Sequence, residues 1–236
     1  MILANHGIIS SSGGLPPSTL LTNLYAVYKS ESNSNDSLGN YNGTAQGGLT
    51  YAAGKSGNAF TFNGTNAYVS LPNNSFNSFT GDFSVSFWYK PIVLSGTKDI
   101  LSSFTEYLTN YYGFQISAFT NNFVIYICDG TLSYVTLQSG AGTAVAGAFS
   151  HVVITRKANT GTKIYINGSL NVSDSSTTNA VFAPTNYNAL GATKSSSSAS
   201  NFANGTLDEV NIWNKELSST EVTELYNAGT GKFYPY

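Results

Sequence analysis

The sequence predicts an all-β, antiparallel fold, built as a sandwich or a barrel. From Leu24 onward, short apolar or alternating runs rich in β-branched and aromatic residues are separated by Gly, Asn, Ser and Asp, which is the pattern of strands joined by turns. These runs do not alternate with helical patterns, so a parallel sheet is not expected. A chain of 236 residues can bury a sizeable core within one domain.

The strands follow one another along most of the chain. Residues 54–71, GKSGNAFTFNGTNAYVSL, indicate a strand, a Gly-Thr turn and a second strand, with a single charged side chain. The sequence ANTG at 158–161 is a hairpin signal between two strand patterns. The further strand patterns lie at 83–92, 112–117, 122–128, 134–138, 150–157, 162–168, 187–192 and 205–214.

One short helix is expected near the C terminus, in residues 217–229. Ser218 and Glu221 stand at the spacing of a capping box, and Gly229 is placed to end the helix. The apolar side chains on one helical face are Val222, Leu225 and Tyr226. By contrast, the low-complexity tract TKSSSSASN, residues 193–201, is expected to be a solvated loop.

The N-terminal segment, residues 1–22, differs from the rest of the chain. It is rich in Ser, Gly and Pro and shows no strand or helix periodicity. Its apolar residues Ile2, Leu3, Ile8 and Ile9 lack a pattern that would bury them in the sandwich, so we expect residues 1–22 to be a docking or assembly segment and residues 23–236 to form the domain. The alternative is that the segment wraps the side of its own domain.

Composition excludes several classes of function. Charged residues make up 9% of the chain and the net charge is -2, so the clustered Lys and Arg of a nucleic-acid-binding protein are missing. The lone Cys128 lies in an apolar run and is expected to be a buried, inert thiol. The N terminus lacks the pattern of a signal peptide, and no run approaches the ~18 apolar residues of a membrane span.

Five segments together resemble a known family. They are YAVYKSESNSNDSLGNYNGT, AGKSGNAFTFNGTNAYVSLP, DFSVSFWYKP, FSHVVITRKANTGTKIYINGSL and GTLDEVNIWNKELSSTEVTELYNAG, and they resemble, in order, the laminin G-like, concanavalin A-like jelly-roll domains, in particular their bacterial and phage branch. The resemblance spans residues 24–229. It implies two antiparallel sheets packed face to face, a concave face and rim loops that bind carbohydrate in many members, and often one structural calcium ion.

Catalysis is not expected. Glucan-cleaving enzymes on this fold carry two carboxylates that face one substrate, whereas Asp208 and Glu209 are adjacent on a strand and should point to opposite faces. His151 opens a strand pattern and is expected to be structural.

A ligand site is expected in the cluster EYLTNYYGF. Tyr111 and Tyr112 are the candidates for exposed rings that stack on a sugar, with Glu106 and Asn110 as hydrogen-bonding neighbours. The alternative is that most of these rings fill the core.

The resemblance also implies a calcium site at the sandwich edge. It suggests the side chain of Asp208, with backbone carbonyls near Asn23 and Gly64, while Asp36 and Asn40 form a second candidate pair. The alternative is that Asp208 accepts only backbone hydrogen bonds from a neighbouring turn.

These observations predict a non-enzymatic virion protein. A surface of amides and hydroxyls suits contact with neutral glycan, and a missing export signal is typical of phage proteins freed by lysis. We therefore expect a tail or head fibre or decoration protein, located on the virion, that contacts other virion proteins or itself through residues 1–22 and a glycan or host surface through the jelly roll. The alternatives are an exported carbohydrate-binding module or adhesin, extracellular or at the cell surface, and then a glycoside hydrolase.

Overall fold

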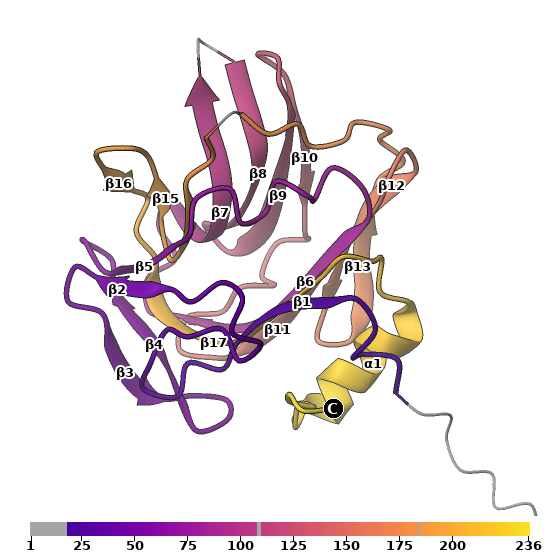
Figure 1. The fold of residues 1–236 in the computed structure, drawn as a ribbon. Coiled ribbons are helices and arrows are strands. Elements are labelled where there is room, and N and C mark those ends of the chain that lie inside the picture. The colour runs from indigo at the N-terminus through magenta and orange to yellow at the C-terminus, as the bar shows by residue number, and fades with distance from the viewer. Residues whose placement is uncertain (1–17, 108–109, 184) are drawn as a thin grey trace, which may run out of the picture.

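The structure, a computed structural model, describes residues 18–107, 110–183 and 185–236 (Figure 1). The side chains of residues 106 and 107 also lie outside this description. Within it the chain forms seventeen strands, one α-helix and a short 3-10 turn at Asn227–Gly229. The prediction of an all-β antiparallel jelly-roll sandwich with one short C-terminal helix is confirmed.

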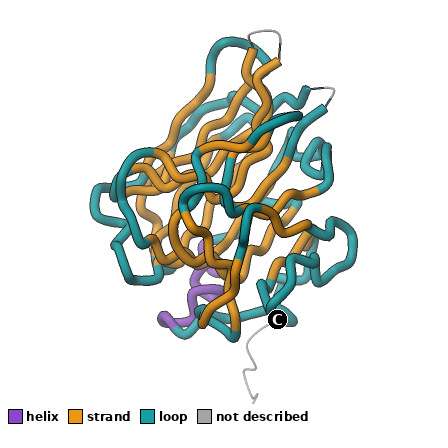
Figure 2. Tube along the Cα trace, turned by 90° about the vertical axis from the view of Figure 1, so that its left-hand side faces the viewer, coloured by secondary structure: helices purple, strands orange, loops and turns teal. Residues whose placement is uncertain are grey.

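Two large antiparallel sheets make up the sandwich, and a small hairpin forms a third sheet (Figure 2). The strands of the eight-stranded sheet are, in spatial order, β13 (Ser169–Ser173), β12 (Gly161–Ile166), β11 (Ser150–Lys157), β6 (Phe83–Pro91), β17 (Asn204–Trp213), β4 (Asn58–Asn63) and β3 (Thr50–Ala53), with β1 (Leu24–Tyr28) paired to β17. The strands of the seven-stranded sheet are β10 (Tyr134–Gln138), β9 (Asn122–Asp129), β8 (Asn110–Phe119), β7 (Thr97–Tyr107), β14 (Asn188–Leu190), β5 (Tyr68–Leu71) and β2 (Thr44–Gln46). The hairpin consists of β15 (Thr193–Lys194) and β16 (Ala199–Ser200).

The core lies between the two large sheets and follows the two-residue period of the strands. On the seven-stranded sheet, alternate residues of β5, β8 and β9 enter the main hydrophobic cluster, and the residues between them face outward. The inward residues of β8 and β9 are Phe114, Ile116, Ala118, Phe123, Ile125 and Ile127. The outer face of this sheet is therefore made by the intervening side chains, such as Gln115 and Tyr126.

Phenylalanine rings fill one end of the core. The ring centroids of Phe76 and Phe79 are 5.4 Å apart, those of Phe79 and Phe83 are 5.6 Å apart, and those of Phe83 and Phe114 are 5.0 Å apart. All four side chains are buried. Rings at this spacing add stacking energy to the apolar area that they remove from water.

Two predicted turns have different outcomes. The ANTG signal closes the β11–β12 hairpin, where Asn159 has φ +54, so this prediction is confirmed. The turn at Asn63–Gly64 also follows a strand, but β4 belongs to the eight-stranded sheet and β5 to the seven-stranded sheet. The two strand patterns of residues 54–71 are thus real, and the turn between them carries the chain from one sheet to the other.

The predicted helix is α1, Ser219–Tyr226, and its start is confirmed. Ser218 Oγ accepts a hydrogen bond from the Glu221 N–H, and the Glu221 carboxylate accepts one from the Ser218 N–H. The predicted end at Gly229 is corrected, because Asn227 takes the left-handed C-cap conformation at φ +46 and stops the helix earlier. Figure 1 shows α1 at the same end of the molecule as the C terminus.

The tract at 193–201 is corrected from a solvated loop to the β15–β16 hairpin. Thr193 pairs with Ser200, Lys194 pairs with Ala199, and the Ser195 N–H donates to the Ser198 carbonyl. The serine repeat therefore forms the turn of a hairpin that projects beside β5 and β2 (Figure 1).

Residues 18–22 pack against their own domain. Leu20 is fully buried in the cluster under α1, and its carbonyl accepts a hydrogen bond from Trp213 Nε1 at 2.7 Å. Thr19 Oγ1 donates to the Glu221 carboxylate at 2.5 Å. The packed domain therefore begins before residue 23, while residues 1–17, which carry Ile2, Leu3, Ile8 and Ile9, lie outside the described residues, and their assembly role stays a prediction. Among the described residues, no helix has the length and apolar character to cross a membrane.

Candidate functional site

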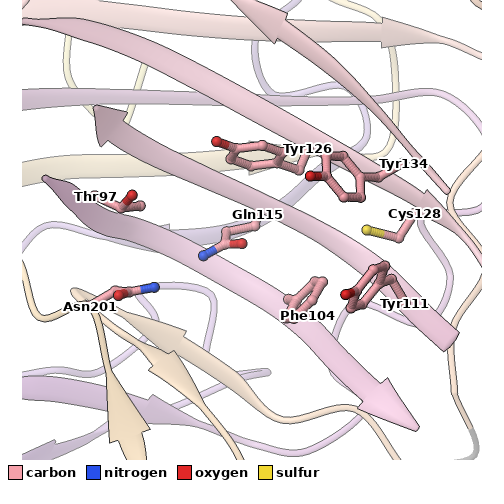
Figure 3. A pocket seen from close by; sticks show the side chains of 8 residues that line it. All are labelled: Thr97, Phe104, Tyr111, Gln115, Tyr126, Cys128, Tyr134 and Asn201. Carbon is pink, nitrogen blue, oxygen red and sulfur yellow. The ribbon is translucent and has the colours of Figure 1, made fainter. Parts of the chain in front are cut away.

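A groove with a volume of about 370 Å³ lies on the outer face of the seven-stranded sheet, over β7 to β10 (Figure 3). We call it the tyrosine groove. Its lining residues come from four strands and from the loop after β16. They are Thr97, Phe104, Tyr111, Gln115, Tyr126, Cys128, Tyr134 and Asn201.

One cross-strand row of the groove carries two small residues between two rings. Phe104 pairs with Gly113, Gly113 with Cys128, and Cys128 with Tyr134. Gly113 has φ +88, and a Cβ there would lie 1.8 Å from the Ser103 carbonyl oxygen, so this position requires glycine. Residues paired across a sheet point to the same face, so the short side chain of Cys128 leaves space beside the ring of Tyr134. Cys128 is free and buried, as predicted, and burial raises its pKa to about 12. Its inertness stays a prediction.

Aromatic rings form the walls. The ring centroids of Tyr126 and Tyr134 are 5.6 Å apart at a steep angle, and those of Tyr111 and Tyr134 are 5.9 Å apart. Tyr111 also stacks on Phe104 at 5.7 Å. Tyr134 is 52% exposed, so a ligand can reach part of its side chain.

A polar network supports the groove. Gln115 Nε2 donates to Thr193 Oγ1 at 2.9 Å, and that hydroxyl donates in turn to the Asp99 carboxylate, which also accepts from Ser117 Oγ at 2.6 Å. Asp99 is fully buried, and this burial raises the pKa of its carboxyl group. The Asp99 N–H donates to the Asn201 carbonyl at 2.9 Å. Asp99 thus ties the β15–β16 hairpin to the sheet and orients Gln115.

Only one of the predicted ligand residues lines the groove, namely Tyr111. Tyr112, the next residue of β8, points to the other face of the sheet. Asn110 is half-buried and does not belong to the lining. Glu106 pairs with Tyr111 along the backbone, and its side chain lies outside the described residues. Sequence reasoning missed most of the lining. The residues it missed are Thr97, Phe104, Gln115, Tyr126, Tyr134 and Asn201.

The predicted calcium ligands do not meet at one point. Gly64 bonds to the start of β17, through its N–H and the Ala203 carbonyl, and Asn23 bonds to the end of β17, through its carbonyl and the Asn214 N–H. Asp208 lies between them. Since a strand rises about 3.3 Å per residue, these positions are roughly 15 Å or more apart.

The oxygens of Asp208 are already engaged by donors. Its carboxylate accepts hydrogen bonds from the backbone N–H groups of Lys55, Ser56 and Glu209 at 2.7 to 3.0 Å. Backbone N–H groups aimed at a carboxylate occupy the lone pairs that a cation would need. This arrangement matches the alternative interpretation of Asp208 as a hydrogen-bond acceptor, and the residues do not fit a calcium ion.

The second candidate pair is arranged in the same way. Asp36 is buried, and its two carboxylate oxygens accept from the N–H groups of Val27, Leu38, Asn40 and Tyr41 at 2.9 to 3.1 Å. Asn40 therefore contributes a donor to Asp36. No group of three or more His, Cys, Asp or Glu side chains among the described residues has a metal-binding arrangement.

Glu209 departs from the regular strand on which the sequence expectation rested. A β-bulge interrupts β17 between Asp208 and Asn211, and Glu209 has φ +49. Both acids are buried, and neither oxygen of Glu209 has a hydrogen-bond partner within residues 18–107, 110–183 and 185–236. Burial, with the neighbouring Asp208 charge second, raises the pKa of Glu209 to about 8. The pair is closed off from any substrate by burial, whatever the direction of the side chains.

His151 is buried in the outer face of the eight-stranded sheet. Its Nε2 lies 2.9 Å from Ser86 Oγ, and its ring lies against Trp88 and Tyr226 with centroids 4.8 and 5.9 Å apart. Both His151 and Ser86 are 1% exposed, and burial lowers the pKa of His151 to about 3. A substrate cannot reach this pair, so His151 has the structural position that the sequence indicated.

Two antiparallel sheets packed face to face define the jelly-roll sandwich. The chain belongs to the concanavalin A-like lectin/glucanase superfamily, whose match covers residues 63–223. The family resemblance read from the sequence is thereby confirmed, and its assignment to the bacterial and phage branch stays a prediction. A search of the curated proteins finds no match.

Solved structures share the fold at low sequence identity. Domain 4 of AbnA, a GH43 extracellular arabinanase from Geobacillus stearothermophilus solved in complex with arabinotriose, is 23% identical with a TM-score of 0.67; the alignment covers 89% of this chain and 98% of that domain. The binding domain of botulinum neurotoxin DC in complex with SialylT is 18% identical with a TM-score of 0.68, over 88% of this chain and 52% of that chain. The binding domain of Paraclostridial Mosquitocidal Protein 1 is 21% identical with a TM-score of 0.68, over 88% and 52%. This chain thus spans about half the length of the two toxin domains.

Proposed function

We propose that the chain is a non-enzymatic binding domain whose tyrosine groove takes a neutral saccharide. The observation that carries this proposal is the groove of about 370 Å³ that the rings of Tyr111, Tyr126 and Tyr134 line. A pyranose or furanose ring has an apolar face that packs on an aromatic ring, as other apolar groups do. Its hydroxyls then need donors and acceptors at the rim, because buried polar groups must be hydrogen-bonded.

The lining favours a neutral ligand. None of the eight residues that line the groove is Asp, Glu, Lys, Arg or His, and the polar groups they offer are the phenolic hydroxyls, the amides of Gln115 and Asn201 and the hydroxyl of Thr97. Such groups hydrogen-bond to sugar hydroxyls and do not neutralise a charge. Among the described side chains the lining contains no carboxylate, whereas glycoside hydrolysis requires a pair of them.

The comparisons support the ligand class. The family is one of lectins and glucanases, and the AbnA domain with this fold was solved with arabinotriose bound. The neurotoxin domain was solved with SialylT. These likenesses establish the fold, and the groove residues of this chain carry the argument for its ligand.

We further propose that the domain is displayed on a virion, as part of a tail or head fibre or a decoration protein. The support is the low charge of a chain rich in amides and hydroxyls and the N-terminal segment that precedes the packed domain. The alternative is an exported carbohydrate-binding module or adhesin, which is favoured by the likeness to a domain of an extracellular enzyme over 98% of that domain. Co-purification with virions from a lysate distinguishes the two.

Isothermal titration with neutral oligosaccharides, beginning with arabinotriose and including glucose-, galactose- and mannose-based trisaccharides, tests the binding proposal. We expect one of them to bind, and Tyr134→Ala to weaken that binding on the order of tenfold, the equivalent of about 1.4 kcal/mol. Tyr134 is exposed, so its loss should leave folding intact. Tyr234→Ala, which changes a tyrosine outside the groove, is the control. Equal affinity of wild type and Tyr134→Ala would contradict the proposal.

A further inference from the structure

A second hollow, with a volume of about 420 Å³, lies on the same outer face at its opposite edge, between β2, β5 and the β15–β16 hairpin. In Figure 1 the hairpin lies beside β5 and β2. Asn201, the residue after β16, lines the tyrosine groove. Across β2 and β5, Gln46 pairs with Tyr68 and Thr44 with Ser70. Tyr68 and Ser70 are two residues apart and therefore point to the same face as the hollow.

The hollow holds a cation, Lys194, that forms no ion pair with any described residue. Lys194 Nζ donates to Ser70 Oγ at 2.8 Å and lies 5.8 Å from the centroid of the Tyr187 ring. The ion pairs among the described residues use other lysines, namely Lys157, Lys163, Lys215 and Lys232. Lys194 is half-buried, and this desolvation lowers the pKa of its ammonium group. A partly desolvated charge without a partner interacts more strongly with an incoming anion than a charge on an open surface does.

Aromatic and amide groups surround this cation. The rings of Tyr68 and Phe202 lie with centroids 6.1 Å apart at 44°, and both are half-buried walls of the hollow. The side-chain amide of Gln46 has no hydrogen-bond partner among the described residues, and Asn66 Oδ1 accepts from Asn63, which leaves its amide N–H groups unpaired there. A ring platform, free amides and one cation together match a sugar that bears an acidic group.

We propose that this hollow is a second saccharide site, specific for an acidic sugar such as a hexuronic acid. The carboxylate pairs with Lys194, the sugar ring lies on Tyr68 and Phe202, and the hydroxyls bond to Gln46 and Asn66. The site is separate from the tyrosine groove, whose described lining side chains are uncharged. The two sites therefore bind different monosaccharide units of a glycan. Either proposal can be contradicted by experiment without contradicting the other.

Methyl β-glucuronide and methyl β-glucoside, which differ only at C6, are the probes, titrated into ¹⁵N-labelled full chain and followed by amide chemical shifts. We expect the glucuronide to shift amides of residues 66–70 and 194–202 and to bind at least tenfold more tightly than the glucoside, with affinity that falls as salt rises. Lys194→Gln should lose this preference and Lys194→Arg should keep most of it. Lys90→Gln is the control, because Lys90 lies over the Phe149 ring away from the hollow.

Three outcomes would overturn the proposal. They are equal binding of the two glycosides, unchanged glucuronide binding in Lys194→Gln, and binding of sodium sulfate as tight as that of the glucuronide, which would make the hollow a simple anion site. Thermal unfolding of Lys194→Gln separates loss of the ligand from loss of the hairpin. A Tyr134→Ala variant should bind the glucuronide as wild type does, so failure of the tyrosine groove is seen independently.

Discussion

Glu209 gives the folded chain a built-in dependence on pH. The residue is 1% exposed, and neither oxygen of its carboxyl group has a hydrogen-bond partner in the part of the chain that the structure describes. Burial raises its pKa most, the charges of Asp208 and Glu31 raise it further, and Lys29 opposes them. The other ionisable group that interacts with it is Tyr236, whose pKa is raised mainly by burial and also by the Glu209 charge. Folding therefore favours the protonated form of Glu209.

The expected size follows from the two pKa values. The pKa of Glu209 rises from 4.5 to about 8 on folding. The folded state is stabilised by the protonated form of Glu209. This stabilisation is fully present below pH 4.5 and is lost as pH rises toward 8, because the unfolded chain then binds fewer protons than the folded one. At about 1.4 kcal/mol per pKa unit, this group alone should lower the free energy of unfolding by roughly 3 kcal/mol between pH 5 and pH 8.

Glu209→Gln tests this reasoning by urea unfolding at pH 5, 6, 7 and 8. The variant carries a neutral side chain of the same size, so the decrease in stability from pH 5 to pH 8 should shrink by roughly 3 kcal/mol. Glu224→Gln, which removes the surface partner of Lys232, is the control and should keep the wild-type dependence on pH. The reasoning would be refuted by a Glu209→Gln variant whose stability falls with pH as steeply as that of wild type.

Three further changes test the packing and the metal site. Arg156, 1% exposed, donates to the carbonyls of Ser176 and Thr178, so Arg156→Ala should lower the free energy of unfolding by about 3 kcal/mol, and a loss below about 1 kcal/mol in urea unfolding would contradict this. Ser218→Ala removes the N-cap hydroxyl of α1 and should cost about 1 kcal/mol, which a matched unfolding curve measures. EDTA should leave the Tm of wild type unchanged, because backbone N–H groups occupy the Asp208 carboxylate; a fall in Tm that Asp208→Ala abolishes would restore the calcium interpretation.

Features with local causes could be predicted from the sequence. The capping box of Ser218 and Glu221 and the ANTG hairpin each depend on residues within a few positions of one another, and both are present as expected. The turn at Gly64 has an equally clear local signal, yet the sheet that the next strand joins is decided by packing far along the chain. Local patterns thus gave strands and turns, and long-range packing decided their partners.

The tyrosine groove shows why most of the site could not be predicted. Alternation in YGFQIS and NFVIYIC places Gly113 with Gln115, and Tyr126 with Cys128, on common faces of their strands. The groove, however, depends on the strand register that brings Tyr111, Cys128 and Tyr134 together from three strands. Asn201 comes from a segment that composition indicated as a solvated loop.

The bulge at Glu209 marks a second limit of sequence reasoning. The two-residue period predicts opposite faces for Asp208 and Glu209 only while the strand is regular. A left-handed Glu at φ +49 has no local signature, because Asn, Asp and Gly are the residues that usually adopt this conformation. Its burial among Lys29, Glu31 and Tyr236 depends on segments from both ends of the chain.

Chemical-shift mapping with the tightest neutral oligosaccharide of the titration panel tests the central claim most directly. The account predicts that the amides that shift belong to the tyrosine groove, at residues 111–115, 126–128 and 134. The amide shifts of the eight-stranded sheet should not change. Tyr134→Ala should reduce these shifts at the same ligand concentration. Shifts confined to the outer face of the eight-stranded sheet around α1, or no shifts with any neutral oligosaccharide at millimolar concentration, would contradict it.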